Sequence, residues 1–268
     1  MYYDRRIDDE LAEALKRGGP LAWLMEHVGS AEGRAHHAHL QFRRARSGGR
    51  RRGSVQLYWG RTSPLGLQLR RGHKVRLSAN RSYQQLSQDL FSRSIPIDAL
   101  LPLKREVKAH LERSSRLLRG PSKRRGAFLK GEAICHAGMM WRYGHRWGPE
   151  DSLVAVDSEA RVGFESRVAQ RKADRQLRAT LRLAATEALP KKLDTMGVSK
   201  RGDLVLVEVK DAEGSIARAA TQVAAHVERF SALMRGGGLR DTVQAMLDQK
   251  RALGVIPVGP NLAAAPQI

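Results

Sequence analysis

Cysteine and long apolar segments are scarce in this chain of 268 residues. A single cysteine excludes a disulfide within the chain and favours a reducing compartment. No segment approaches the roughly 20 apolar residues that a membrane-spanning helix needs, and residues 1–6 lack the core of a signal peptide. We therefore expect a soluble, cytoplasmic protein without a membrane partner.

Several motifs of nucleotide and metal chemistry are also missing. The sequence has no Walker phosphate loop, no pair of cysteines at CxxC spacing and no G-x-S-x-G segment. ATP-driven and zinc-ribbon functions are therefore not expected. Aromatic residues make up 5% of the chain, so base stacking should not dominate any recognition of nucleic acid.

Acidic residues are few relative to basic ones. Lysine and arginine number 48 against 27 aspartates and glutamates, which gives a formal charge of +21. Such an excess destabilises a compact protein by self-repulsion, so it favours a polyanionic partner such as nucleic acid. The excess is uneven, because residues 1–150 hold 30 basic and 13 acidic residues whereas residues 151–268 hold 18 and 14.

Residues suited to phosphodiester chemistry follow an apolar segment in the C-terminal half. Residues 204–210 form a predicted strand whose two faces both begin apolar, and Glu208 and Lys210 come last, on the same face. Turn residues precede this strand, so residues 192–198 are predicted to pair antiparallel to it. This pairing should bring the carboxylates of Asp194 and Glu208 close enough to share one cation, with Lys210 beside them.

Apolar side chains at helical spacing surround these strands in the sequence. Pro190 should end the first helix and the three glycines at 236–238 the second. A final apolar segment, residues 254–258, is predicted to be a strand. The helices are predicted over residues 163–188, 215–233 and 239–253.

The order of these features resembles that of the PD-(D/E)XK nuclease superfamily, and within it that of archaeal Holliday junction resolvase-like proteins. Glu165 lies on a helix, Asp194 on a strand and Glu208-Val209-Lys210 on the next strand, which a helix follows. The pair Phe164-Glu165 begins the first helix, as in those resolvases. The resemblance covers roughly residues 155–258. It implies an α/β domain with a restriction endonuclease-like mixed sheet flanked by helices.

The resemblance also implies a metal site. Asp194 and Glu208 would bind Mg²⁺ or Mn²⁺ together with the Val209 carbonyl, and Glu165 would bind the metal through water. Two carboxylates hold a hard cation through oxygen, and the cation polarises the phosphate and activates water.

Two further catalytic residues follow from the resemblance. Lys210 would orient or activate the attacking water and stabilise the phosphate, and Gln222 stands where related nucleases often have a polar residue. The alternative for Glu208 and Lys210 is a solvent-facing ion pair, worth at most about 1 kcal/mol. The alternatives for Asp194, Glu165 and Gln222 are a turn residue, a first-turn helix residue and a surface amide.

The N-terminal half has the pattern of a basic α+β domain. Helical spacing occurs over residues 7–28, with a break at Gly18-Gly19-Pro20, and again over residues 101–118. Alternating segments predict half-exposed antiparallel strands. These strands are predicted over residues 39–42, 54–59 and 65–69, with an extension at 75–77.

Residues 43–53 are predicted to form a mobile basic loop between the first two of those strands. The positive charges repel one another, so we favour contact with phosphates over a loop that is only solvated. The arginines that would bind nucleic acid are Arg43, Arg44, Arg46, Arg50, Arg51 and Arg52.

A break in pattern at residues 120–126 predicts two domains. Residues 1–125 would form a nucleic-acid-binding domain and residues 126–268 a nuclease-like domain.

The sequence thus predicts a Mg²⁺-dependent endonuclease acting on nucleic acid, with DNA favoured over RNA, and is compatible with a homodimer. One alternative is a non-catalytic nucleic-acid-binding protein with a decayed or accidental motif. Another is a basic protein that assembles on ribosomes or on a protein partner.

Overall fold

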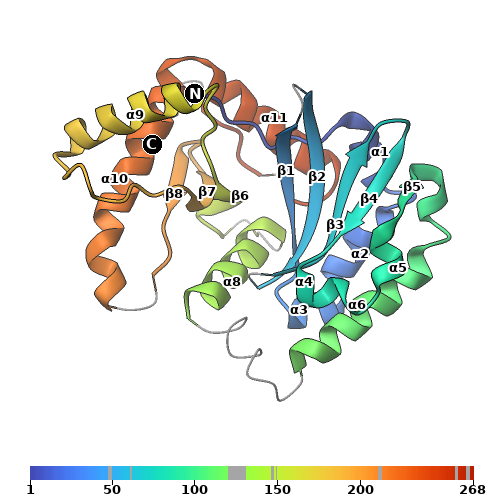
Figure 1. Cartoon of the computed structure of the whole chain (residues 1–268). Coiled ribbons are helices and arrows are strands. Elements are labelled where there is room, and N and C mark those ends of the chain that lie inside the picture. The colour runs from blue at the N-terminus through green and yellow to red at the C-terminus, as the bar shows by residue number, and fades with distance from the viewer. Residues whose placement is uncertain are drawn as a thin grey trace. The chain divides into compact units, whose positions relative to one another are not determined.

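The chain divides into two compact units in the computed structural model (Figure 1). Unit 1 comprises residues 1–4, 147–248 and 258–268, and unit 2 comprises residues 5–146 and 249–257. The structure describes residues 1–47, 50–60, 62–119, 131–145, 148, 150–210, 213–256, 259–263 and 266–268. This division differs from the predicted boundary between residues 125 and 126, which lies outside the described residues.

Unit 2 is built around a five-stranded antiparallel sheet in the order β1-β2-β3-β4-β5. The strands are β1 (His39–Ser47), β2 (Arg50–Trp59), β3 (Thr62–Arg70), β4 (Lys74–Ser78) and β5 (Ser94–Pro96). The helices are α1 (Asp9–Leu15), α2 (Ala22–Gly29), α3 (Ala31–Ala35), α4 (Arg81–Gln84), α5 (Gln88–Ser92), the 3-10 helix η1 (Ile97–Leu100), α6 (Lys104–Arg119) and α8 (Glu132–His145).

Burial explains why the predicted strands of unit 2 form. Alternate apolar side chains of β1 and β2, such as Phe42, Leu57 and Trp59, are buried, while β3 is buried through most of its length. Helix α6 contacts β3 and α8 contacts β1. The predicted strands and the helices at residues 7–28 and 101–118 are therefore confirmed, but β3 is buried over most of its length rather than half-exposed. No helix among the described residues is long and apolar enough to cross a membrane.

The segment predicted as a mobile basic loop is largely a β-hairpin. Strands β1 and β2 remain paired from Arg43 opposite Ser54 to Ser47 opposite Arg50. Residues 48 and 49 lie outside the described part of the chain. The sequence there is Gly-Gly, a dipeptide that favours two-residue hairpin connections.

Unit 1 is built around a three-stranded antiparallel sheet in the order β6-β7-β8. The strands are β6 (Leu153–Ala160), β7 (Leu193–Ser199) and β8 (Leu204–Val207), and the helices are α9 (Arg167–Leu181), α10 (Glu213–Arg235) and α11 (Gly238–Ala252). Helix α10 contacts both α9 and β8 (Figure 1). The boundary between the units falls within α11.

The chain is thus α/β in content, but every strand pairing among its described residues is antiparallel rather than mixed. The predicted strand at residues 254–258 does not form over 254–256, and residues 257 and 258 are not described. Instead, the N–H groups of Gly254 and Val255 donate to the carbonyls of Arg251 and Lys250, at 2.8 and 2.9 Å. With Gly254 at a φ of +68°, these bonds close the end of α11.

Helix α9 is shorter than predicted at both ends. It begins after Ser166, whose hydroxyl accepts a hydrogen bond from the N–H of Ala169 at 3.1 Å and so caps the helix. It ends at Leu181, because Arg182 adopts a left-handed φ of 54° and Leu183 N–H donates back to the carbonyl of Arg178.

The N-terminal residues belong to unit 1, contrary to the predicted domain division. Tyr2 forms a two-bond antiparallel bridge with Gly163, at 2.9 and 2.8 Å. The Tyr3 hydroxyl donates to buried Asp157 at 2.6 Å, and the Tyr3 ring packs edge-on against Phe230. These contacts tie Tyr2 to the segment between β6 and α9, and Tyr3 to β6 and α10.

Replacing Tyr3 tests how far this attachment stabilises unit 1. Tyr3→Phe removes a buried hydrogen bond to a carboxylate, and such bonds contribute about 1.5–3 kcal/mol. We expect urea unfolding to show a loss of this size. Tyr58→Phe is the control, since its hydroxyl donates to a neutral amide, Gln56, at 2.9 Å in a half-buried position and should cost less. Equal losses in the two variants would contradict the prediction.

Candidate active site

The register of β7 and β8 brings Asp194 and Glu208 together. Thr195 lies opposite Val207 in this antiparallel pair. Asp194 precedes Thr195 on β7 and Glu208 follows the end of β8, so continuing this register by one step would set the two opposite each other. Directly opposed residues in an antiparallel pair project to the same face and have Cβ atoms about 5 Å apart.

Lys210 holds the two carboxylates in one cluster. Its ammonium donates to Glu208 Oε1 at 2.8 Å and to the Val209 carbonyl at 3.0 Å, and lies 3.8 Å from Asp194 Oδ2. The Val209 N–H donates to Asp194 Oδ2 at 2.9 Å. The side chains of Lys210, Glu208 and Asp194 are only 12%, 5% and 21% exposed, so this is not a solvent-facing ion pair.

Burial and the neighbouring charges perturb the Glu208 carboxyl. Burial raises the pKa of its carboxyl, and the charge of Asp194 raises it further. Hydrogen bonds from Lys210 and from the Asp194 backbone oppose this rise in pKa. Glu208 Oε2 is buried and has no hydrogen-bond partner among the described residues. A buried acceptor of this kind suggests that a ligand binds beside it.

His226, on α10, belongs to the same region and was missed in the sequence. Burial lowers the pKa of its ring to about 4, and the charge of Arg229 contributes, so the ring is neutral near pH 7. Asp194 and Lys210 also influence this pKa, and the ring donates a hydrogen bond to the backbone of Lys192. Within the described structure Nε2 is buried and has no partner, so Nδ1 makes that bond and Nε2 is left as an acceptor.

Gln222 lies one helical turn before His226 on α10. Its Oε1 atom is also buried, and no residue in the described part of the chain donates to it. Residues four apart share a helix face. This spacing from Gln222 was the signal in the sequence that could have identified His226.

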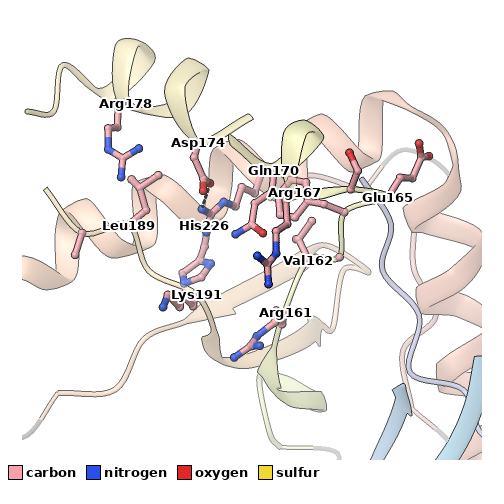
Figure 2. A pocket seen from close by; sticks show the side chains of 15 residues that line it. Arg161, Val162, Glu165, Arg167, Gln170, Asp174, Arg178, Leu189, Lys191 and His226 are labelled. Carbon is pink, nitrogen blue, oxygen red and sulfur yellow. Dashed lines mark hydrogen bonds and ion pairs between the residues drawn. The ribbon is translucent and has the colours of Figure 1, made fainter. Parts of the chain in front are cut away.

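The structure does not bring Glu165 into the cluster. This residue precedes the cap of α9, and its side chain is exposed. It lines a pocket whose walls do not include Asp194, Glu208 or Lys210, and Figure 2 shows its carboxylate pointing away from Arg161. Over the described residues, no group of three or more histidine, cysteine or acidic side chains is arranged to hold a metal.

The smaller set of oxygen atoms still fits a hard cation. Two carboxylates and one backbone carbonyl converge on the Lys210 ammonium, and Glu208 Oε2 has unused acceptor capacity. Mg²⁺ is commonly bound by one or two carboxylates, with waters and substrate phosphates completing its shell. Asp194, Glu208 and Val209 are therefore a chemically suitable site for Mg²⁺ or Mn²⁺.

The arginines predicted to bind nucleic acid lie on the hairpin of unit 2. Arg43 is half-buried, and its guanidinium donates to Gln41 and to the Phe42 carbonyl. For the other five, the structure describes the backbone only. These five residues lie on β1 or β2: Arg44, Arg46, Arg50, Arg51 and Arg52.

The pKa of Glu208 provides a test of the cluster. Its carboxyl should titrate above an ordinary glutamate in an NMR titration. Lys210→Met should raise this pKa further because a hydrogen bond and a positive charge are lost, whereas Asp194→Asn should lower it because a like charge is lost. Since the folded state binds this proton more tightly, protonated Glu208 stabilises the fold below the ordinary glutamate pKa. This contribution disappears as pH rises through the raised value.

Lys200→Met is the matched control for that titration. Lys200 is exposed and precedes the opposite end of β8. Its replacement removes the same charge and should leave the pKa of Glu208 unchanged. An ordinary pKa for Glu208, or shifts in the same direction in the Lys210 and Asp194 variants, would be incompatible with the described cluster.

Comparisons with models of known protein families, with curated proteins and with solved structures gave no match. The resemblance to PD-(D/E)XK nucleases therefore rests on the residues of this chain and on their order along it.

Proposed function

We propose that unit 1 carries a metal-dependent nuclease site centred on Asp194, Glu208 and Lys210. The observation that carries the proposal is a buried cluster of two carboxylates, a carbonyl and an ammonium beside buried acceptors that have no partner in the described structure. Each such unsatisfied acceptor lowers the stability of the fold by about 1–3 kcal/mol. A ligand that hydrogen-bonds to these acceptors would remove this cost.

The residues of the cluster have distinct roles in this proposal. Asp194, Glu208 and the Val209 carbonyl would hold Mg²⁺ or Mn²⁺, which would polarise the phosphate and lower the pKa of water. The Lys210 ammonium, released from the carboxylates, would donate to the phosphate or to the attacking water. Its positive charge would offset the negative charge that develops on the phosphate oxygens.

The neighbouring face of α10 would support this chemistry. His226 presents a neutral ring nitrogen as a hydrogen-bond acceptor, and Gln222 presents an amide oxygen. Both atoms can accept a hydrogen bond from a water molecule or from a hydroxyl group of the substrate. We assign both to positioning rather than to metal binding, and His226 forms no metal-holding group with Asp194 and Glu208 among the described residues.

Nucleic acid is the proposed substrate, and DNA is favoured over RNA. The charge of +21 supports a polyanion as the partner, and six arginines within residues 43–52 lie on the β1–β2 hairpin. One observation favours a different function: Lys210 already pairs with Glu208 and lies near Asp194, as a purely structural ion pair would. In that case the protein binds nucleic acid without cleaving it.

Cleavage assays with charge-removing variants distinguish the two functions. The wild-type protein should cleave DNA with Mg²⁺ or Mn²⁺ but not with EDTA. Asp194→Asn, Glu208→Gln and Lys210→Ala should each reduce the rate by at least about a hundredfold. In EDTA, DNA affinity should stay equal or rise in the two carboxylate variants and fall slightly in the lysine variant, because the charge facing the phosphates changes.

Two exposed residues of unit 1 serve as controls. Asp241, on α11, has a side chain that is 80% exposed, and Lys200 is exposed in the turn before β8. Asp241→Asn and Lys200→Ala change charge in the same way and should retain full activity. If the three cluster variants remain folded and equally active, the ion pair is structural and the non-catalytic function replaces this proposal.

The hairpin arginines are tested by the salt dependence of binding. Replacing all six with glutamine should flatten the plot of log affinity against log salt by about 0.9 for each phosphate that these arginines neutralise. Cleavage of saturating substrate should survive. The control replaces four exposed cations of α6: Arg105, Lys108, Arg113 and Arg116. If both variants lower the slope of log affinity against log salt by the same amount per charge removed, the hairpin arginines contact phosphates no more than other surface cations do.

A further inference from the structure

A pocket of about 590 Å³ in unit 1 has a strongly basic lining (Figure 2). It is bounded by residues 161–167, by α9, by residues 188–191 and by His226 and Arg229 of α10. Five basic residues line it: Arg161, Arg167, Arg178, Lys191 and Arg229. The acidic residues in its lining are Glu165 and Asp174.

Neither acidic residue neutralises the centre of the pocket. Asp174 accepts a hydrogen bond from Arg229 at 2.9 Å, so these two charges offset each other. Glu165 points away, whereas Figure 2 shows the guanidinium of Arg167 directed toward Arg161. The remaining positive charge favours an anion.

A second, independent feature points to a ligand at the same place. His226 lines the pocket and is 2% exposed, and its Nε2 atom has no hydrogen-bond partner in the described structure. The N-terminal end of α9 also lies in the pocket wall, where the helix dipole and the first N–H groups favour negative charge. The Ser166 hydroxyl accepts a hydrogen bond from one of these N–H groups, that of Ala169.

The size of the pocket argues for more than a bare ion. Sites for small organic ligands are about 300–1,000 Å³, and this pocket falls within that range. Val162, Phe164 and Leu189 add apolar wall that suits a sugar or a base. A phosphate monoester carries up to about two negative charges, more than the single charge of an internal diester, and so matches the cation excess better.

We propose that this pocket binds the phosphorylated end of a nucleic-acid strand. The inference rests on the proposed nuclease function, because it assigns a substrate feature to that site. The chain itself connects the two places: Lys191 lines the pocket, and Asp194 follows three residues later, near the start of β7. A strand end held here presents a bond near that end to the cluster, so the enzyme acts at phosphorylated strand ends.

Binding in EDTA tests the pocket independently of cleavage. The probes are one short oligonucleotide in three forms, with a 5′-phosphate, with a 3′-phosphate and with neither. One phosphorylated form should bind at least about tenfold more tightly than the unphosphorylated form. Arg161→Ala combined with Arg167→Ala should abolish this preference. Both arginines are exposed, and an unchanged melting temperature would verify the fold.

A matched control and a second variant make the result decisive. Arg171 and Arg175 are also exposed on α9 but do not line the pocket, so their double replacement with alanine should preserve the preference. Lys191→Ala, at an exposed position on the other wall, should reduce it. Equal binding of all three probes, or a preference that survives loss of Arg161 and Arg167, would overturn the proposal.

Competition with inorganic phosphate distinguishes a strand-end site from a simple anion site. Comparing the binding and cleavage results distinguishes failure of the pocket proposal from failure of the nuclease proposal. Inorganic phosphate should compete only weakly; if it binds as tightly as the phosphorylated oligonucleotide, the pocket is a simple anion site and the strand-end proposal fails. A phosphate preference without metal-dependent cleavage would refute the nuclease function while retaining the pocket. Cleavage that depends on Lys210 but shows no end preference would refute the pocket alone.

Discussion

The pairing of β7 with β8 is the constraint on which the candidate site depends. Because Thr195 pairs with Val207, Asp194 comes to lie opposite Glu208 at the open end of the hairpin. A shift of this register by one residue would move one carboxylate to the other face of the sheet. Strand β7 pairs with β6 on one edge and with β8 on the other, so a shift on either edge would break several ladder pairs. Packing of the sheet therefore fixes the geometry of the charges.

The same site illustrates how a functional cluster differs from an optimised core. Placing two carboxylates side by side with low exposure is unfavourable, and Lys210 offsets only part of that cost. The unpartnered acceptors of Glu208, Gln222 and His226 in the described structure add to it. Sites that must bind a cation or a substrate commonly retain such unfavourable groups. If every acceptor already had a partner within the protein, none would be available to coordinate or hydrogen-bond a ligand. The stability of unit 1 must come from elsewhere, including β6 and the residues that contact it.

Sequence periodicity was sufficient for the parts of this fold that depend on local pattern. Alternation identified β1 to β4, and helical spacing identified α6, α10 and α11, because burial of one face determines each pattern. The limits of α9 depended instead on the Ser166 cap and on a left-handed Arg182, which spacing does not reveal. Strand β6 was missed because its partner β7 lies more than thirty residues away, beyond a helix.

The candidate site shows the same division between local and distant information. The proximity of Asp194, Glu208 and Lys210 could be predicted because a short hairpin joins them, so strand alternation alone brings them together. Glu165 was misplaced because its position depends on where α9 begins. His226 was missed because its relation to the cluster arises from the packing of α10 against β8, and the only local sign of it was its spacing of four residues from Gln222.

The small number of donors in the cluster has a consequence for how metal and substrate would bind. Two carboxylates and a carbonyl leave most of the coordination shell of Mg²⁺ to water and to substrate oxygen atoms. The Lys210 ammonium also competes for the same oxygens, at 2.8 Å from Glu208 and 3.0 Å from the Val209 carbonyl. Metal alone should therefore bind weakly, and a phosphate should strengthen it by supplying ligands and by drawing Lys210 away. Linkage requires the metal to strengthen phosphate binding by the same factor. The site would then assemble fully only when nucleic acid is present.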